Sequence, residues 1–103
     1  MTTKLFKVTW SPSAYADIQN IYYYIKKFLK EPEIANNLSK KILKSISDLS
    51  YFPEKYPKIK YKSKNIRKML VNNYVIIYEI NNNTNIVSVL HIFNNRQNYF
   101  YYL

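Results

Sequence analysis

The chain has 103 residues, of which 48% are hydrophobic, and its 16 Lys and Arg residues against 6 Asp and Glu residues give a formal charge of +10 at pH 7. This length allows one domain, and the hydrophobic content is enough to build a core, which excludes a disordered tail. Because the chain has no Cys and one His, it excludes disulfide frameworks and thiolate metal sites, and we expect neither a metal nor a cofactor.

The positive charge has two interpretations. A field of this strength on a small domain favours a polyanion or an acidic protein as partner over a neutral ligand. The abundance of Asn, Lys, Ile and Tyr also indicates an AT-rich genome, whose codon bias raises the Lys content without any partner. No apolar run approaches the ~20 residues that span a bilayer, so we expect a cytoplasmic protein with no membrane partner.

A strand followed by a helix is predicted at the N-terminal end. Residues 5–10 alternate like a short strand, and Ser11-Pro12-Ser13 follows as a helix start, since serine accepts backbone N–H bonds and proline suits the first turn. The helix is predicted to reach about Leu29. Its apolar stripe has helical spacing and consists of Ala14, Ile18, Ile21, Ile25 and Phe28.

A second helix is predicted after Glu31-Pro32-Glu33, because proline interrupts one helix and can open the next. Its apolar face consists of Ala35, Leu38, Ile42, Ile46 and Leu49. Phe52-Pro53 ends it. The two helices should form an antiparallel αα-hairpin.

Strands dominate the rest of the chain. Residues 54–64 are predicted to be a Lys- and Tyr-rich loop with room for one edge strand, and strands are predicted at 66–71, 74–80 and 86–93. Asn72-Asn73 suits a two-residue hairpin, because Asn tolerates positive φ and the chain has no Gly.

The expected fold is therefore α+β with the order β-α-α-β-β-β. An antiparallel sheet carries the αα-hairpin on one face, and the first strand lies at an edge or pairs with the last strand. One domain spans residues 1–103.

The order of these motifs resembles that of the RelE/ParE superfamily of type II toxin–antitoxin toxins. The similar pieces are Trp10-Ser11-Pro12 with Asp17-Ile18, the second helix ending at Phe52-Pro53, Arg67 with Leu70, the Tyr74–Ile80 strand, and Val89–Phe93 with Arg96. No single piece is diagnostic, but their order and spacing together are fairly specific.

The resemblance implies two branches. ParE-like members act on DNA gyrase without a recognised hydrolytic site, whereas RelE-like members are ribosome-dependent endonucleases that cut mRNA. Both imply a cognate antitoxin that wraps the toxin, and operator DNA is expected only through the antitoxin complex. The two long helices and the Phe52-Pro53 helix end resemble the ParE branch more closely.

Arg67, Arg96 and Tyr99 are the catalytic candidates if the chain is RelE-like. Cleavage through the 2′-hydroxyl needs a proton acceptor, cations on the phosphorane and a proton donor to the leaving oxygen. Val75, however, stands where the resemblance places a RelE-like catalytic Arg, which favours the ParE-like function.

Basic residues of the second half are the candidates for target binding: Lys60, Lys62, Arg67, Lys68 and Arg96. They can neutralise phosphates while neighbouring tyrosines stack on bases. The alternative is a solvated loop, with Arg67 paired to Glu79 or Asp48. A non-toxic basic binding module is the corresponding alternative for the whole chain.

Aromatic residues are the candidates for antitoxin contact. Three consecutive tyrosines, Tyr22, Tyr23 and Tyr24, span most of a helix circumference, so at least one should be exposed unless a partner covers it. His91, the only histidine, is expected to be a structural residue rather than a catalyst.

Overall fold

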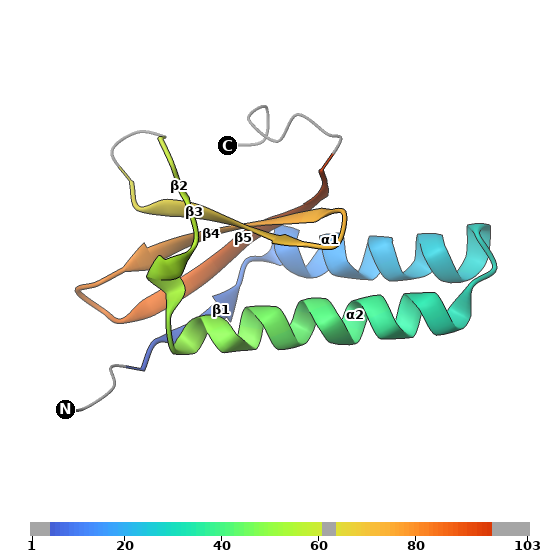
Figure 1. Cartoon of the computed structure of the whole chain (residues 1–103), viewed down its shortest axis with the longest axis horizontal. Helices are drawn as coiled ribbons and strands as arrows, with labels where there is room; N and C mark the ends of the chain where they lie inside the picture. Colours follow the sequence, from blue (N-terminus) through green and yellow to red (C-terminus); the bar gives the residue numbers. More distant parts are fainter. Residues whose placement is uncertain (1–4, 61–63, 96–103) are drawn as a thin grey trace.

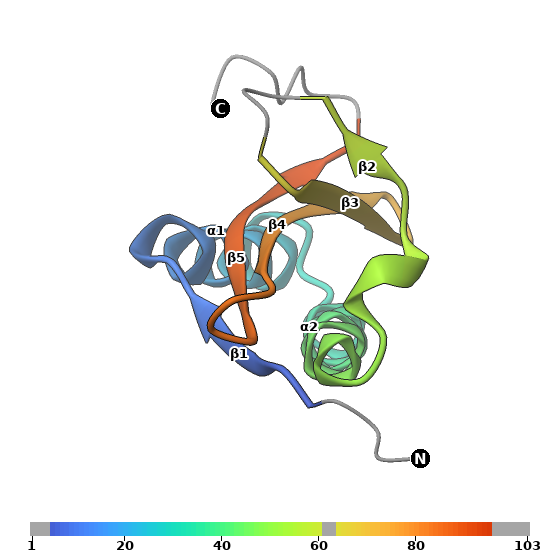
Figure 2. The ribbon, with the colours of Figure 1, turned by 90° about the vertical axis from the view of Figure 1, so that its left-hand side faces the viewer.

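A helical hairpin lies against one face of a five-stranded sheet in the computed structural model, which describes residues 5–60 and 64–95 (Figure 1). Both helices pack on the same face of the sheet, where their residues share one core, and Figure 2 gives the end-on view. The chain order is β1 (Lys7–Trp10), α1 (Pro12–Tyr23), a π-helical turn (Tyr24–Phe28), α2 (Pro32–Ser47), 3-10 turns at Asp48–Ser50 and Pro53–Lys55, β2 (Lys58–Ile59), β3 (Ile66–Val71), β4 (Tyr74–Asn81) and β5 (Ile86–Asn94). The predicted α+β class and the hairpin on one face are confirmed.

The sheet is mixed, with the strand order β1-β5-β4-β3-β2. Neighbours are antiparallel except β1, which runs parallel to β5 from Lys7 opposite Ile86 to Trp10 opposite Val89. The expectation of a purely antiparallel sheet is therefore wrong at this edge. The direction of β1 is not set by a tight turn between strands, because the helical hairpin follows β1. The hairpin returns the chain to the start of β1, where the Phe6 N–H donates to the Ser50 carbonyl at 2.8 Å.

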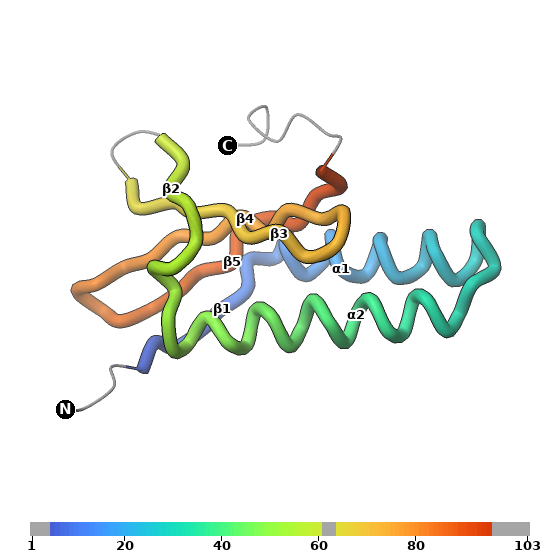
Figure 3. Tube along the Cα trace, viewed as in Figure 1, coloured from blue at the N-terminus to red at the C-terminus, as the bar shows by residue number. Residues whose placement is uncertain are grey.

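The predicted start of α1 is confirmed. Ser11 has extended backbone angles and its Oγ accepts the Ala14 N–H at 3.0 Å, while Pro12 occupies the first turn. The predicted stripe buries Ala14, Ile18 and Ile25, but Phe28 is 78% exposed. Phe28 departs from the stripe because the last turn is π-helical, which shifts the phase of the stripe, and because the hairpin extends past the sheet at this end (Figure 3).

The α2 face packs on the inner face of the sheet, as predicted. Its four predicted residues Ala35, Leu38, Ile42 and Ile46 are buried, and Ile42 is fully covered. Leu49, the fifth predicted residue, is also buried but lies in the 3-10 turn that follows α2, so the helix ends earlier than Phe52-Pro53. With α1 they enclose the main core, to which the sheet contributes Met69, Val71, Ile76, Tyr78, Ile80, Val87, Val89 and Ile92.

The opposite, outer face of the sheet carries a second cluster. We call Ile59, Ile66, Val75, Ile77 and Phe93 the outer apolar cluster. Because side chains alternate along a strand, β4 supplies Ile76 and Tyr78 to one face and Val75 and Ile77 to the other. All four are at most 1% exposed, so β4 is buried on both faces.

The chain makes its left-handed turns without glycine. Positive φ angles occur at Lys30 (54°), Asn72 (54°) and Asn85 (57°) among the described residues. Asn72 was expected at the β3–β4 turn. Lys30 was not, and it ends the hairpin tip, where the Glu31 N–H donates to the Ile25 carbonyl at 3.1 Å.

We predict that Lys30→Gly raises the free energy of unfolding by about 0.5 to 1 kcal/mol, because glycine removes the steric cost of the left-handed conformation, less its own extra chain entropy. Urea unfolding monitored by circular dichroism measures the effect. Lys27→Gly is the matched control in the helical turn, and it should lower stability by about 1 kcal/mol. Destabilisation of the same size by both substitutions would contradict the prediction.

Candidate functional site

The Arg67 guanidinium is bound to backbone carbonyls. Its Nη1 donates to the Glu54 carbonyl and to the Tyr56 carbonyl, each at 2.8 Å, and its Nε donates to Asn65 Oδ1 at 3.2 Å. Arg67 lies on the inner side of β3, because Met69, two residues further on, belongs to the main core. The guanidinium therefore holds the segment between α2 and β2 against the sheet.

Neither of the acidic residues predicted to pair with Arg67 contributes to the hydrogen bonds of its guanidinium. Asp48 pairs with Lys44 at 2.7 Å on α2. Glu79 lies opposite Ile66 in the β3–β4 register, one position from Tyr78, which faces Arg67. Backbone acceptors thus take the place that the sequence assigned to a carboxylate.

Tyr78 holds the same segment from β4. Its buried hydroxyl donates to the Pro53 carbonyl at 2.5 Å, and the Lys68 N–H of β3 donates to the Pro57 carbonyl at 3.1 Å. Burial raises the pKa of the Tyr78 hydroxyl above its usual value of 10.0, and the nearby Arg67 charge only partly opposes this increase. We call Arg67 and Tyr78 the carbonyl clamp.

The predicted target-binding residues do not share one face. Lys60 is exposed after the edge strand β2, Arg67 points to the inner face, and Lys68, its neighbour on the strand, points to the outer face. The separation follows from the alternation of side chains along β3. Lys62, Arg96 and Tyr99 lie outside the described residues.

Val75 occupies the middle of the outer face. It is 1% exposed and belongs to the outer apolar cluster with Ile77 and Phe93. A charged head group at this position would be buried without a partner, at a cost of several kcal/mol. The outer face around Val75 is therefore hydrophobic.

The three consecutive tyrosines do not form one surface. Tyr22 is half-buried, and its hydroxyl donates to Asn36 Oδ1 of α2 at 3.0 Å. Tyr23 is 50% exposed and lines a shallow groove with Gln19 and Ser39. Tyr24 is 54% exposed and lines a different, larger groove, because residues adjacent along a helix point about 100° apart.

The larger groove, here the Tyr24 groove, lies between the end of the helical hairpin and the β3–β4 turn and has a volume of about 500 Å³. Leu29 and Ile34 line it beside Tyr24, and both are more than half exposed. Lys41 Nζ donates to Asn72 Oδ1 at 2.6 Å across its floor, which ties α2 to the β3–β4 turn.

The sequence prediction did not include Leu29 and Ile34 in a binding surface. A signal was nevertheless present, since Ile34 lies just outside the buried stripe of α2 and Leu29 follows the last residue of the α1 stripe. Large apolar residues beside a complete stripe are candidates for partner contact.

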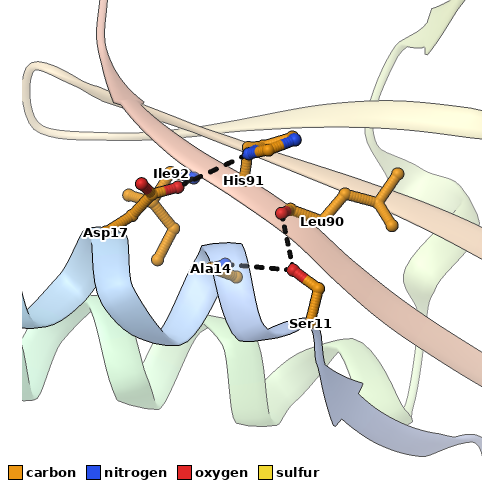
Figure 4. A network of polar contacts seen from close by, with 6 residues as sticks. All are labelled: Ser11, Ala14, Asp17, Leu90, His91 and Ile92. Atoms are coloured by element: carbon orange, nitrogen blue, oxygen red, sulfur yellow. Dashed lines mark hydrogen bonds and ion pairs between the residues drawn. The ribbon is translucent and has the colours of Figure 1, made fainter. Parts of the chain in front are cut away.

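A polar network joins the start of α1 to β5 (Figure 4). β1 accompanies β5 only as far as Val89, since the chain then turns into the helix. Beyond this point, Ser11 Oγ donates to the Leu90 carbonyl at 2.7 Å, and Asp17 Oδ2 accepts the Ile92 N–H at 2.9 Å. Side chains of α1 therefore supply hydrogen bonds that β1 no longer can.

His91 belongs to the same network. Its Nδ1 lies 3.7 Å from Asp17 Oδ2, and its ring stacks on Phe93 with centroids 5.1 Å apart. These contacts support the structural role expected from the sequence. Within residues 5–60 and 64–95, no three His, Asp or Glu side chains gather as a metal site would require, and no helix is long and apolar enough to cross a membrane.

A sequence profile described as the ParE toxin of the type II toxin–antitoxin system parDE matches residues 8–99. The chain belongs to the ParE toxin family. A comparison with curated proteins finds no significant match.

Solved structures show that the ParE-family fold of this chain is shared with RelE. It is similar to the chromosomal ParDE toxin–antitoxin system of P. aeruginosa, with a TM-score of 0.70 and 17% identity over 88% of this chain and 97% of that chain. A free mutant of the E. coli toxin RelE superposes with a TM-score of 0.68 and 11% identity, over 95% of this chain and 92% of that chain. For the RelE–RelB complex of the archaeon Pyrococcus horikoshii the TM-score is 0.66 and the identity 15%, over 90% of this chain and 98% of that chain. At these identities the similarity shows the fold alone.

We predict that Tyr78→Phe lowers the free energy of unfolding at pH 7 by about 1 to 3 kcal/mol, because it leaves the Pro53 carbonyl without its donor. Because the pKa of Tyr78 is raised in the folded state, its neutral hydroxyl stabilises the fold below pH 10, and this contribution is lost as pH rises through the folded-state pKa. The stability of the unsubstituted protein should therefore fall more steeply above pH 10 than that of the variant.

Denaturant unfolding at a series of pH values measures both effects. Tyr15→Phe is the matched control on an exposed tyrosine, and it should leave the stability at pH 7 unchanged. Equal alkaline slopes for the Tyr78 variant and the unsubstituted protein would show that this hydroxyl makes no pH-dependent contribution.

Proposed function

We propose that this ParE-family chain is a toxin that inhibits DNA gyrase in the cytoplasm and is neutralised by a cognate antitoxin. The match over residues 8–99 supports the toxin assignment. Gyrase as target, the antitoxin, and contact with operator DNA only through the antitoxin complex are inferred from the resemblance to ParE.

The burial of Val75 carries the choice of gyrase over mRNA. The resemblance puts a catalytic arginine of RelE-like enzymes at this position, and here a fully covered valine lies between Ile77 and Phe93 in the outer apolar cluster. A cation needs water or a partner at such a place, and the cluster offers neither. The outer face is thus built for packing.

The contacts of Arg67 support the same choice. Stabilising a phosphorane requires cationic groups aimed at the substrate, whereas the Arg67 head group donates to the carbonyls of the segment between α2 and β2. The remaining candidates for a RelE-like site are Arg96 and Tyr99. The fold is common to both branches and does not separate them, so ribosome-dependent mRNA cleavage is the alternative that the experiment must test.

We expect induced expression of the chain in bacteria to change DNA supercoiling and leave mRNA intact. Plasmid topology and primer extension on abundant transcripts give the two measurements from the same cells. Purified gyrase should likewise lose supercoiling activity in the presence of the protein.

Arg67→Ala, Arg96→Ala is the informative variant. If mRNA is cleaved in phase with codons and this double substitution abolishes the cleavage, RelE-like catalysis replaces the gyrase proposal. Unimpeded growth with the soluble, folded protein would leave the non-toxic binding module.

The Tyr24 groove is the proposed position of the antitoxin. Its apolar rim of Tyr24, Leu29 and Ile34 suits the hydrophobic face of an amphipathic segment. Glu31 and Lys41 are the charged residues of its lining, so the groove can meet a side chain of either sign at its border. The P. horikoshii RelE is described in complex with RelB, which supports a protein partner for this fold. Burying these exposed side chains would provide much of the binding free energy.

We predict that Tyr24→Ala, Leu29→Ala weakens antitoxin binding by at least about tenfold, since two apolar contacts near the centre of an interface are lost. Growth rescue by the cognate antitoxin tests this, with binding measured by calorimetry. Tyr23→Ala, on the other groove, is the matched control and should leave affinity unchanged. A larger loss in the Tyr23 variant would move the proposed contact to that side of the hairpin.

A further inference from the structure

The outermost strand β2 presents lysines along an open sheet edge. Its hydrogen-bonded neighbour is β3, and within residues 5–60 and 64–95 no strand follows it in the sheet order. Ile59 turns into the outer apolar cluster, whereas Lys58 and Lys60, on either side of it, are exposed. Lys55 and Lys64 are exposed at the two ends of this edge. We call Lys55, Lys58, Lys60 and Lys64 the basic edge.

Positive charge accumulates in the sequence around this edge, directly after Glu54. From position 55 to position 68 the sequence includes Lys55, Lys58, Lys60, Lys62, Lys64, Arg67 and Lys68 but neither Asp nor Glu. Elsewhere on the surface Lys44 pairs with Asp48, and Lys41 donates to Asn72. Lysines protect an edge strand from pairing with other chains, and the accumulation here extends over both ends of the edge as well as the strand itself.

The carbonyl clamp fixes the backbone that leads into the basic edge. Arg67 and Tyr78 bind the carbonyls of Pro53, Glu54 and Tyr56, and the Lys68 N–H binds that of Pro57. β2 then pairs with β3 at Lys58 and Ile59. Lys55 and Lys58 thus project from a backbone that is held by hydrogen bonds, and less conformational entropy is lost when they meet a ligand.

We propose that the basic edge binds the phosphate backbone of duplex DNA. Protein partners are recognised through buried aromatic and apolar anchors, while DNA interfaces are polar and strongly positive, as this edge is. Single strands bind largely by stacking on exposed aromatics. Within residues 55–60 and 64–68 the one described aromatic, Tyr56, is half-buried against the main core beneath Lys55.

This contact goes beyond inhibition of gyrase. It is made by the toxin itself, without the antitoxin through which operator DNA is otherwise reached, and it does not require the enzyme. For a protein that acts on gyrase it would add affinity for the DNA that gyrase holds. Arg67 acts here as a positioning residue, since its head group is bound to carbonyls.

Fluorescence anisotropy with the purified full chain and a labelled DNA duplex, over a range of NaCl concentrations, tests the proposal. Lys58→Gln, Lys60→Gln, Lys64→Gln should reduce the slope of log K against log salt by about 0.9 for each lysine and lower the affinity at least about tenfold at low salt. Lys26→Gln, Lys27→Gln, Lys40→Gln removes the same charge elsewhere and should retain the affinity to within about twofold.

Three outcomes would overturn the proposal. Equal loss in both triple variants would show that net charge alone binds DNA. Tighter binding of a single-stranded RNA of equal length would assign the edge to RNA. If the variant with Lys58, Lys60 and Lys64 replaced binds DNA normally but no longer inhibits gyrase, the basic edge contacts a protein. Normal DNA binding by an unsubstituted protein that fails to inhibit gyrase would instead refute only the proposed function.

Discussion

The burial of β4 on both faces is the constraint on which the rest of this structure depends. Ile76 and Tyr78 need the helical hairpin on one side, and Val75 and Ile77 need the outer apolar cluster on the other. Removing this much apolar surface from water supplies a large share of the folding free energy. It also limits what the centre of the sheet can do chemically, because the covered side chains of residues 75–78 cannot reach a substrate.

Polar side chains next to β4 serve the backbone. At one end of the sheet Ser11 and Asp17 bond to β5 where β1 leaves it, and towards the other edge Arg67 and Tyr78 bond to the carbonyls before β2. Each joins a helix or loop to the sheet at a point where no strand can provide the hydrogen bond. Residue types typical of active sites therefore stabilise the fold here.

The two proposed binding surfaces are built from different elements and have different chemistry. The Tyr24 groove lies between the hairpin end and the β3–β4 turn and is largely apolar, whereas the basic edge follows β2 and is strongly positive. An antitoxin seated in the groove need not cover the edge. Because the two surfaces are separate, an antitoxin bound in the Tyr24 groove would control the toxin by blocking its contact with gyrase and not by covering the basic edge.

Sequence periodicity alone determined the elements of this protein: both helices, the β3–β5 hairpins and the buried face of α2 follow from spacing, caps and turn residues, which are local. The tertiary structure decided the parallel pairing of β1 with β5, the exposure of Phe28 and the partners of Arg67. Each of these depends on where a distant segment lies. Arg67 shows the reason most plainly, since a guanidinium donates hydrogen bonds to carboxylates and carbonyls alike, and only the folded position of residues 54–56 made carbonyls its neighbours.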